Sequence, residues 1–231
     1  MAMNYKISTY VAKENESNNV KGFANVVFGE SLKVTNIVIL QKKDSDELFI
    51  SMPRYRSNEI DENGNPVYKD ICNPTTSEFR ESFYSNIIKS FNYACEHGGK
   101  TEMVVGDAKE GMPPVTVSVS LSDKEGSSLR GFGRIYIDDS FVIGNVSVVQ
   151  GKDNLFVAMP SYKTRQIDEN GKPIYQDIVF PITKDFRKEL FDKVLDGYED
   201  AKKKAAEKYA DKVSKEMDYP EERVERDNPF R

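Results

Sequence analysis

The chain has 231 residues, enough for one large domain or for two of about 100 residues each. Its hydrophobic content of 38%, charged content of 31% and net charge of −5 suit small cores beneath a well-solvated surface. The apolar runs are far too short to span a bilayer, and Met1–Tyr10 lacks the basic start and apolar run of a signal peptide, so we expect a soluble, cytoplasmic protein that does not bind membranes.

An internal repeat organises the chain. Residues 48–74 read LFISMPRYRSNEIDENGNPVYKDICNP, and residues 155–181 read LFVAMPSYKTRQIDENGKPIYQDIVFP. The match begins upstream, where residues 21–23 correspond to 130–132, and it continues downstream, where residues 79–80 correspond to 186–187. Such self-similarity is typical of a duplicated structural module. We therefore expect unit A at residues 5–94 and unit B at residues 115–201.

In unit A, Asn63-Gly64 is a strong signal for a hairpin turn, because both residues tolerate the positive φ of such turns. Further along, apolar residues recur at helical spacing and predict an amphipathic helix: Phe79, Phe83, Ile87, Ile88 and Phe91. The following stretch, 95–114, contains four glycines and Pro113-Pro114, a composition typical of a linker.

Unit B shows the strand pattern clearly. Residues 115–121 alternate apolar and polar side chains, which predicts a strand with one buried face. Two more strands are expected near 135–137 and 141–149, separated by a turn at Asp138-Asp139 and interrupted by a bend or bulge at Gly144-Asn145. Residues 155–159 predict a short apolar strand. Asn170-Gly171 repeats the hairpin signal, with residues 174–179 as the return arm.

A helix should close unit B. Pro181 ends the sheet, and Thr183 is well placed as the N-cap. The apolar residues that follow at helical spacing are Phe186, Leu190, Val194, Leu195 and Tyr198. Each unit is therefore predicted to be an α+β module, an antiparallel sheet followed by a C-terminal amphipathic helix. The charged stretch Lys202–Lys215 is expected to prolong the second helix within a last segment, 202–231, that ends in a polar tail.

The order of these motifs resembles the SpoVG family of sporulation and septation proteins. The resemblance rests on Leu-Phe-Val-Ala-Met-Pro-Ser followed by basic residues, a hairpin with glycine, Tyr-x-Asp-Ile, a proline and a helix that starts with phenylalanine. Residues 129–200 follow the family order throughout, and residues 20–93 do so with slightly more drift. The resemblance implies small α+β domains that dimerise through their sheets, bind DNA and RNA, and regulate bacterial processes without catalysis. It also implies that basic residues in and after the Met-Pro-Ser loop contact nucleic acid, here Arg54, Arg56, Lys163 and Arg165.

Two features depart from the family pattern. Family members usually carry one unit per chain, so we expect units A and B to pair as an intramolecular pseudo-dimer. The other feature is charge, because phosphate binding depends on lysine and arginine. Unit A has 11 basic and 12 acidic residues and unit B has 11 and 14, so neither is basic overall. We therefore expect weak, salt-sensitive binding of DNA or RNA through a local patch.

The hairpins carry the candidate patch. Its residues are Arg54, Tyr55, Arg56 and Tyr68 in unit A, and Tyr162, Lys163, Arg165 and Tyr175 in unit B. Basic side chains beside exposed tyrosines can hold phosphates while bases stack on the rings. The alternative interpretation is that these are solvated hairpin charges, offset by Asp61-Glu62 and Asp168-Glu169.

Other functions find less support in the sequence. One histidine, His97, and two cysteines, Cys72 and Cys95, do not supply the converging ligands that zinc requires. Neither unit contains a histidine that could activate a nucleophile. We expect no enzyme, no cofactor and no metal. The alternative to nucleic-acid binding is an interaction protein whose sheet edges add strands of a partner or of further copies.

Overall fold

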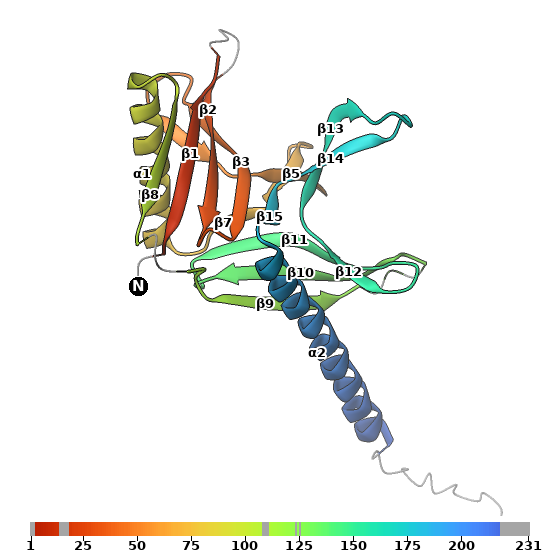
Figure 1. Cartoon of the computed structure of the whole chain (residues 1–231). Helices are drawn as coiled ribbons and strands as arrows, with labels where there is room; N and C mark the ends of the chain where they lie inside the picture. The colour runs from red at the N-terminus through yellow and green to blue at the C-terminus, as the bar shows by residue number, and fades with distance from the viewer. Residues whose placement is uncertain (1–2, 14–18, 108–110, 123, 125, 218–231) are drawn as a thin grey trace, which may run out of the picture.

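The computed structural model describes residues 3–13, 19–107, 111–122, 124 and 126–217 (Figure 1). Unit A has the order β1 (Tyr5–Val11), β2 (Val20–Phe28), β3 (Leu32–Gln41), β4 (Leu48–Ser51), β5 (Arg54–Ile60), β6 (Pro66–Asp70), β7 (Cys72–Pro74), α1 (Ser77–Glu96) and β8 (Lys100–Val105). Unit B has the order β9 (Val115–Leu121), β10 (Leu129–Ile137), β11 (Phe141–Gln150), β12 (Leu155–Ala158), β13 (Ser161–Ile167), β14 (Pro173–Asp177), β15 (Val179–Pro181) and α2 (Lys184–Met217). The predicted α+β class and the duplicated order of elements are confirmed.

The two units exchange short strands. β7 leaves unit A and pairs antiparallel with β11 of unit B, while β15 leaves unit B and pairs antiparallel with β3 of unit A. One sheet has the order β15-β3-β2-β1-β8, with β4 also on β3. The other has the order β12-β11-β10-β9, with β7 also on β11. The exchange confirms the expected intramolecular pseudo-dimer.

A bulge in β3 and another in β11 make room for the exchanged strand. Asn36 and Asn145 have φ values of 61° and 56°, a left-handed conformation that asparagine tolerates better than most residues. The bulge divides the outer edge of each strand, so that β3 holds β15 at Leu32–Val34 and β4 at Val38–Gln41. Beside each bulge, the N–H of Thr35 donates to the carbonyl of Ile178 (2.8 Å) and the N–H of Gly144 donates to that of Ile71 (2.7 Å). Of the bend or bulge predicted at Gly144-Asn145, the structure therefore has a bulge, and the exchanged strand joins the other unit beside it.

Both units contribute to one core. Phe141 of unit B lies against Phe28 and Phe83 of unit A, with ring centroids 5.0 and 5.7 Å apart, and all three side chains are fully buried. Cys72 and Val179, which occupy the same position in the two exchanged strands, are also fully buried. Apolar burial of this kind is the main favourable term in folding. The core therefore holds the halves together as one folded body.

Threonine caps both helices. The hydroxyl of Thr76 accepts from the N–H of Phe79 (3.2 Å), and that of Thr183 accepts from the N–H of Phe186 (3.3 Å), as predicted for Thr183. Helix α2 continues past unit B to Met217, so the predicted prolongation is confirmed, whereas residues 218–231 of the polar tail lie outside the described part. Among the described residues, neither helix combines the length and apolarity needed to cross a membrane.

The stretch 95–114, interpreted from its composition as a linker, contains an additional strand. β8 pairs antiparallel with β1 and forms the outer edge of the unit A sheet (Figure 1). Gly98, Gly99 and Gly106 flank this strand with φ values of 89°, 81° and 81°, so these glycines turn the chain into and out of the sheet. The interpretation as a linker missed β8 because unit B has no copy of it to mark it as structured.

Candidate nucleic-acid interface

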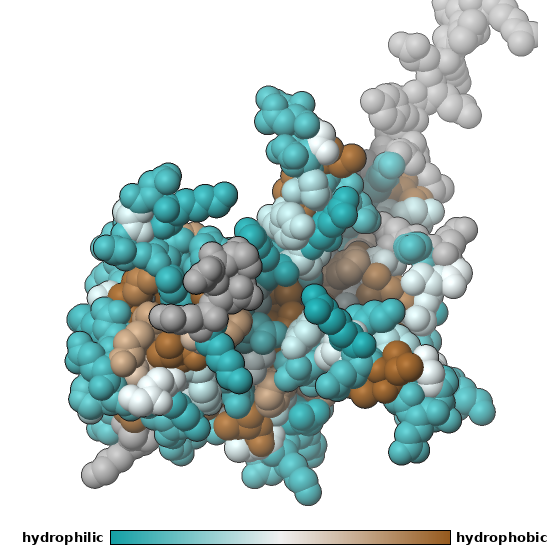
Figure 2. Space-filling model, turned by 90° about the horizontal axis from the view of Figure 1, so that it is seen from above, coloured by the Kyte–Doolittle hydropathy of each residue, from teal (hydrophilic) through white to brown (hydrophobic). Residues whose placement is uncertain are grey.

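Each candidate patch lies on a two-stranded hairpin at the crossover between the units. The chain leaves β4 or β12, forms the hairpin, and enters the sheet of the other unit as β7 or β15. Hydrogen bonds close the hairpin bases, from the N–H of Ile71 to the carbonyl of Pro53 (2.7 Å) and from Ile178 to Pro160 (2.8 Å). Because β5–β6 and β13–β14 form sheets of their own, they project from the main sheets as arms (Figure 1). From above, apolar residues form separate patches among hydrophilic side chains (Figure 2).

Aspartate holds the tip of each arm. The Asp61 carboxylate accepts from the N–H groups of Asn63 (2.9 Å) and Asn65 (2.7 Å), and Asp168 accepts from those of Asn170 and Lys172 at the same distances. These hydrogen bonds lower the pKa of Asp61, and the bond from the backbone N–H of Asn65 has the largest effect. The sequence predicts a turn in which both Asn63 and Gly64 have positive φ. In the structure only Gly64 of these two does, with a φ of 80°. The side-chain bonds to Asp61 stabilise this turn instead.

On the arm of unit A, one face combines two cations with a tyrosine. Arg56 lies directly opposite Tyr68, and Arg54 lies opposite Asp70. Alternate residues of a strand share a face, so these four side chains lie together. The Arg54 guanidinium sits over the Tyr68 ring, 5.0 Å from its centroid, and the ring remains 52% exposed. This face can offer positive charge and an aromatic surface together.

The arm of unit B repeats half of this arrangement. Lys163 lies directly opposite Tyr175, as Arg56 does opposite Tyr68, and Tyr175 is 62% exposed. Ser161 occupies the position of Arg54, so no arginine covers the Tyr175 ring from there. The cation and the opposing tyrosine at these positions are therefore the features that both arms share.

The other predicted residues lie elsewhere. Tyr55 is partly buried against the core and lies opposite Lys69, on the face away from Arg54 and Arg56. Tyr162 lies opposite Gln176 and donates its hydroxyl to that side chain (2.6 Å). The structure thus separates these two tyrosines from the cationic faces.

Arg165 lies in the irregular part of β13. The pairing with β14 shifts between Lys163 and Ile167, so Arg165 has no opposing residue in the regular ladder. Its counterpart in unit A is Asn58, which means that this positive charge is not duplicated.

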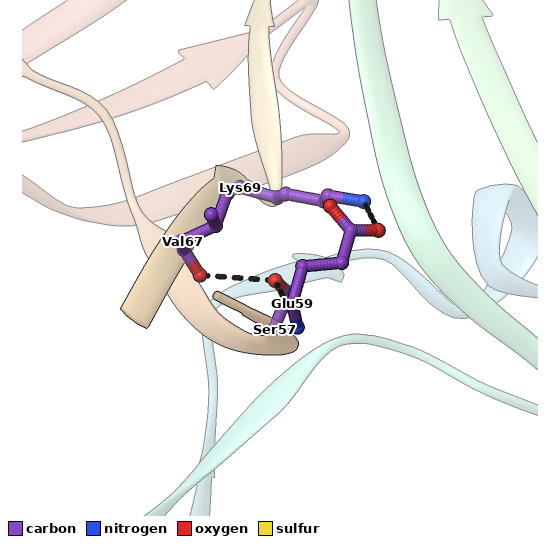
Figure 3. Close-up of polar contacts among 4 residues, drawn as sticks. All are labelled: Ser57, Glu59, Val67 and Lys69. Carbon is purple, nitrogen blue, oxygen red and sulfur yellow. Dashed lines mark hydrogen bonds and ion pairs between the residues drawn. The ribbon is translucent and has the colours of Figure 1, made fainter. Parts of the chain in front are cut away.

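Polar contacts stabilise the face of the unit A arm that points away from Arg54 and Arg56 (Figure 3). Ser57 donates its hydroxyl to the carbonyl of Val67 (3.0 Å), and Lys69 forms an ion pair with Glu59. The hydrogen bond to Glu59 raises the pKa of Lys69. Because Glu59 neutralises Lys69, the free positive charge of this arm lies on the opposite face with Arg54 and Arg56.

The charge of the arms is nearly balanced. Residues 54–70 contain three basic and four acidic residues, and residues 161–177 contain three of each. Burial raises the pKa of Asp70, against the effect of the Arg54 and Arg80 guanidinium groups, which lower it. Any attraction to phosphate must therefore come from local faces.

Two exposed isoleucines were missed by sequence reasoning. Ile60 and Ile167 lie at equivalent positions near the arm tips and are 69% and 68% exposed. The repeat keeps an isoleucine at both positions, directly before Asp61 and Asp168, and that pattern could have drawn attention to them.

Reactive groups are sparse across the described ranges. No cluster of three or more histidine, cysteine or acidic side chains there could hold a metal ion. Cys72 is fully buried and Cys95 exposed, and neither forms a disulfide. Burial raises the pKa of the Cys72 thiol far above its ordinary range, so the thiol stays protonated inside the core.

Comparison with known proteins explains the duplicated architecture. A family model described as SpoVG matches twice, over residues 4–93 and again over residues 112–200. The chain belongs to the SpoVG family. Each match spans one structural unit, so this SpoVG protein carries the family module in tandem.

Individual relatives match one module at a time. Proteins named "Putative septation protein SpoVG" from Treponema denticola, Acholeplasma laidlawii and Phytoplasma australiense are 40%, 38% and 34% identical to this chain over 74 residues. Each alignment covers 32% of this chain and 73%, 72% and 71% of the respective relative. One unit of this SpoVG protein thus corresponds to most of a relative.

Proposed function

We propose that this SpoVG protein is a non-enzymatic bacterial regulator in the cytoplasm that binds single-stranded DNA or RNA weakly through its two arms. The observation that carries the proposal is the shared pair on each arm, a cation directly opposite an exposed tyrosine: Arg56 with Tyr68, and Lys163 with Tyr175. Lysine and arginine bind phosphates, while tyrosine rings stack with bases whatever the sequence. Such a surface suits a flexible single strand, whose bases are free to stack.

The charge balance sets the expected strength. The phosphate-binding cations are few and acids lie at both arm tips, so we expect micromolar or weaker affinity that falls steeply as salt rises. For single strands, each phosphate contact contributes about 0.7 to the slope of log affinity against log salt concentration.

Fluorescence anisotropy with labelled DNA and RNA oligonucleotides at several salt concentrations tests the proposal. The variant carries Arg54→Ala, Arg56→Ala, Lys163→Ala and Arg165→Ala together. We expect it to lose most of the affinity and to show a shallower salt slope, by about 0.7 for each phosphate contact removed.

A matched control removes the same charge elsewhere. Lys21, Lys89, Lys184 and Lys188 are exposed and lie off the arms, so changing them to alanine alters the net charge equally. This control should keep most of the affinity. If both variants lose affinity equally, binding depends on overall charge, and the assignment to the arms is wrong.

The alternative function is a protein scaffold that does not bind nucleic acid. It would be favoured if none of the oligonucleotides bound even at low salt.

A further inference from the structure

The two sheets end differently at equivalent edges. In unit A, β1 pairs with β2 on one side and with β8 on the other. In unit B, β9 pairs with β10 in the way that β1 pairs with β2, but across the described ranges no strand follows on its outer edge. Ile7 and Thr9 of β1 are fully buried, whereas Val117 and Val119, at the same positions of β9, stay partly exposed. The unit B sheet thus lacks the strand that completes unit A.

The outer edge of β9 presents backbone groups that a strand could pair with. The carbonyl of Pro114 accepts from Asp138 and the N–H of Ser122 donates to Arg130, so the even-numbered residues face β10. In an antiparallel ladder the bonding side alternates along the strand. The odd-numbered residues, Val115 to Leu121, therefore turn their N–H and C=O groups outward.

A groove of about 550 Å³ runs between this edge and α2. Its α2 side includes Gly197, Ala201 and Ala205, whose small side chains leave the space open. At Gly197 the helix comes so close that an added Cβ would lie 3.2 Å from Cγ2 of Val119. In unit A, α1 contacts both β1 and β8, and Ala94, the counterpart of Ala201, is fully buried. The groove is thus the place that a β8-like strand would fill.

The groove also carries positive charge. Lys204 and Lys208 line it, and no ion pair of either lysine is found over the described part of α2. The third charged residue of the lining, Asp200, lies 3.6 Å from Lys203. A strand that brings a carboxylate would complement Lys204 and Lys208.

We propose that this groove binds an extended segment of a partner protein, which adds antiparallel to β9 as β8 adds to β1. Its alternate residues are apolar and face α2, and it carries acidic residues for Lys204 and Lys208. Main-chain hydrogen bonds give such strand addition its affinity, and the side-chain positions give it specificity. The face of the incoming strand that packs against α2 must not already be covered by another element. The β9 strand of a second copy does not meet this requirement, because its own α2 covers the corresponding face.

A peptide with the sequence of residues 98–107, GGKTEMVVGD, tests the proposal, because its central residues form β8 in the equivalent position of unit A. With the peptide labelled, fluorescence anisotropy should show saturable binding to the full chain. Val117→Pro removes an outward N–H, and an edge strand tolerates proline at such a position. Ala205→Glu fills the groove with a longer side chain from an exposed helix position. We expect each change to weaken binding at least tenfold.

Ala206→Glu is the matched control, since Ala206 is exposed on α2 and does not line the groove. It should bind the peptide as the unchanged chain does, and circular dichroism should show that all variants fold. The proposal is wrong if the peptide does not bind at millimolar concentration, or if Ala205→Glu and Ala206→Glu bind it equally. It is also wrong if the chain doubles its mass in solution and Val117→Pro restores 26.3 kDa, because a second copy then covers the edge. No outcome depends on nucleic acid.

Discussion

At the scale of single residues, the two arms offer different aromatic surfaces. The Arg54 guanidinium lies 5.0 Å from the centre of the Tyr68 ring, whereas serine stands at that position beside Tyr175. We predict that Tyr175→Ala weakens oligonucleotide binding more than Tyr68→Ala does, within the range of about 1–3 kcal/mol for a base stacked on an aromatic ring. Anisotropy at low salt measures both. Equal losses would contradict the idea that Arg54 occupies part of the Tyr68 surface.

The turn of the unit A arm should respond to pH through Asp61. Backbone hydrogen bonds lower the pKa of this carboxyl below its ordinary value of 3.8. A group with a lowered folded-state pKa stabilises the fold above its unfolded pKa, and this contribution disappears as pH falls through the folded value. We predict that the Asn65 amide resonance titrates with a midpoint below 3.8, followed by NMR. A midpoint at or above that value would show that the carboxylate does not hold the turn.

At the scale of elements, the bulges explain how two sheets exchange strands. Asn145 has a φ of 56°, which β-branched residues adopt only with strain. We predict that Asn145→Val lowers the free energy of unfolding by about 1–3 kcal/mol, whereas Asn145→Gly is tolerated. Urea unfolding of both variants checks this. If valine were as stable as glycine, the left-handed bulge would not be needed for the exchange.

Local patterns predicted most strands of unit B and both helices, but not the partners of these strands. Alternation at 115–121 and the helical spacing from Phe186 depend on which face is buried, so they can be seen in the sequence. Residues 174–179 were expected to form one return arm, yet Ile178 divides them between β14 and β15. Periodicity cannot tell which sheet a strand joins, so the exchanged pairing was not predicted. β8 was missed for another reason, because the glycines and prolines of 95–114 indicated a linker and the internal repeat does not extend to it.

The candidate site was predicted only in part for a related reason. Sequence order placed Arg56 near Tyr68 and Lys163 near Tyr175, and the register puts each pair directly opposite. The same order grouped Tyr55 with Arg54, although neighbours in a strand point to opposite faces.

At the scale of the whole molecule, the shared core should make the halves unfold together. Phe141 is fully buried against rings of the other unit. We predict that Phe141→Ala lowers the free energy of unfolding by about 3–5 kcal/mol and that both units still lose structure in one transition. Hydrogen exchange during urea unfolding can follow each unit separately. Two separate transitions, with unit A unaffected, would contradict a common core.

The paired units also present two arms from one chain. Under the proposed function, a single-stranded nucleic acid long enough to reach both arms should therefore bind more tightly than one that reaches a single arm. The most direct test is an NMR titration of the full chain with a single-stranded oligonucleotide at low salt, monitoring backbone amides. We predict that the shifted resonances concentrate in residues 54–70 and 161–177 together. Shifts confined to other parts of the chain, or the absence of any shift, would contradict this account.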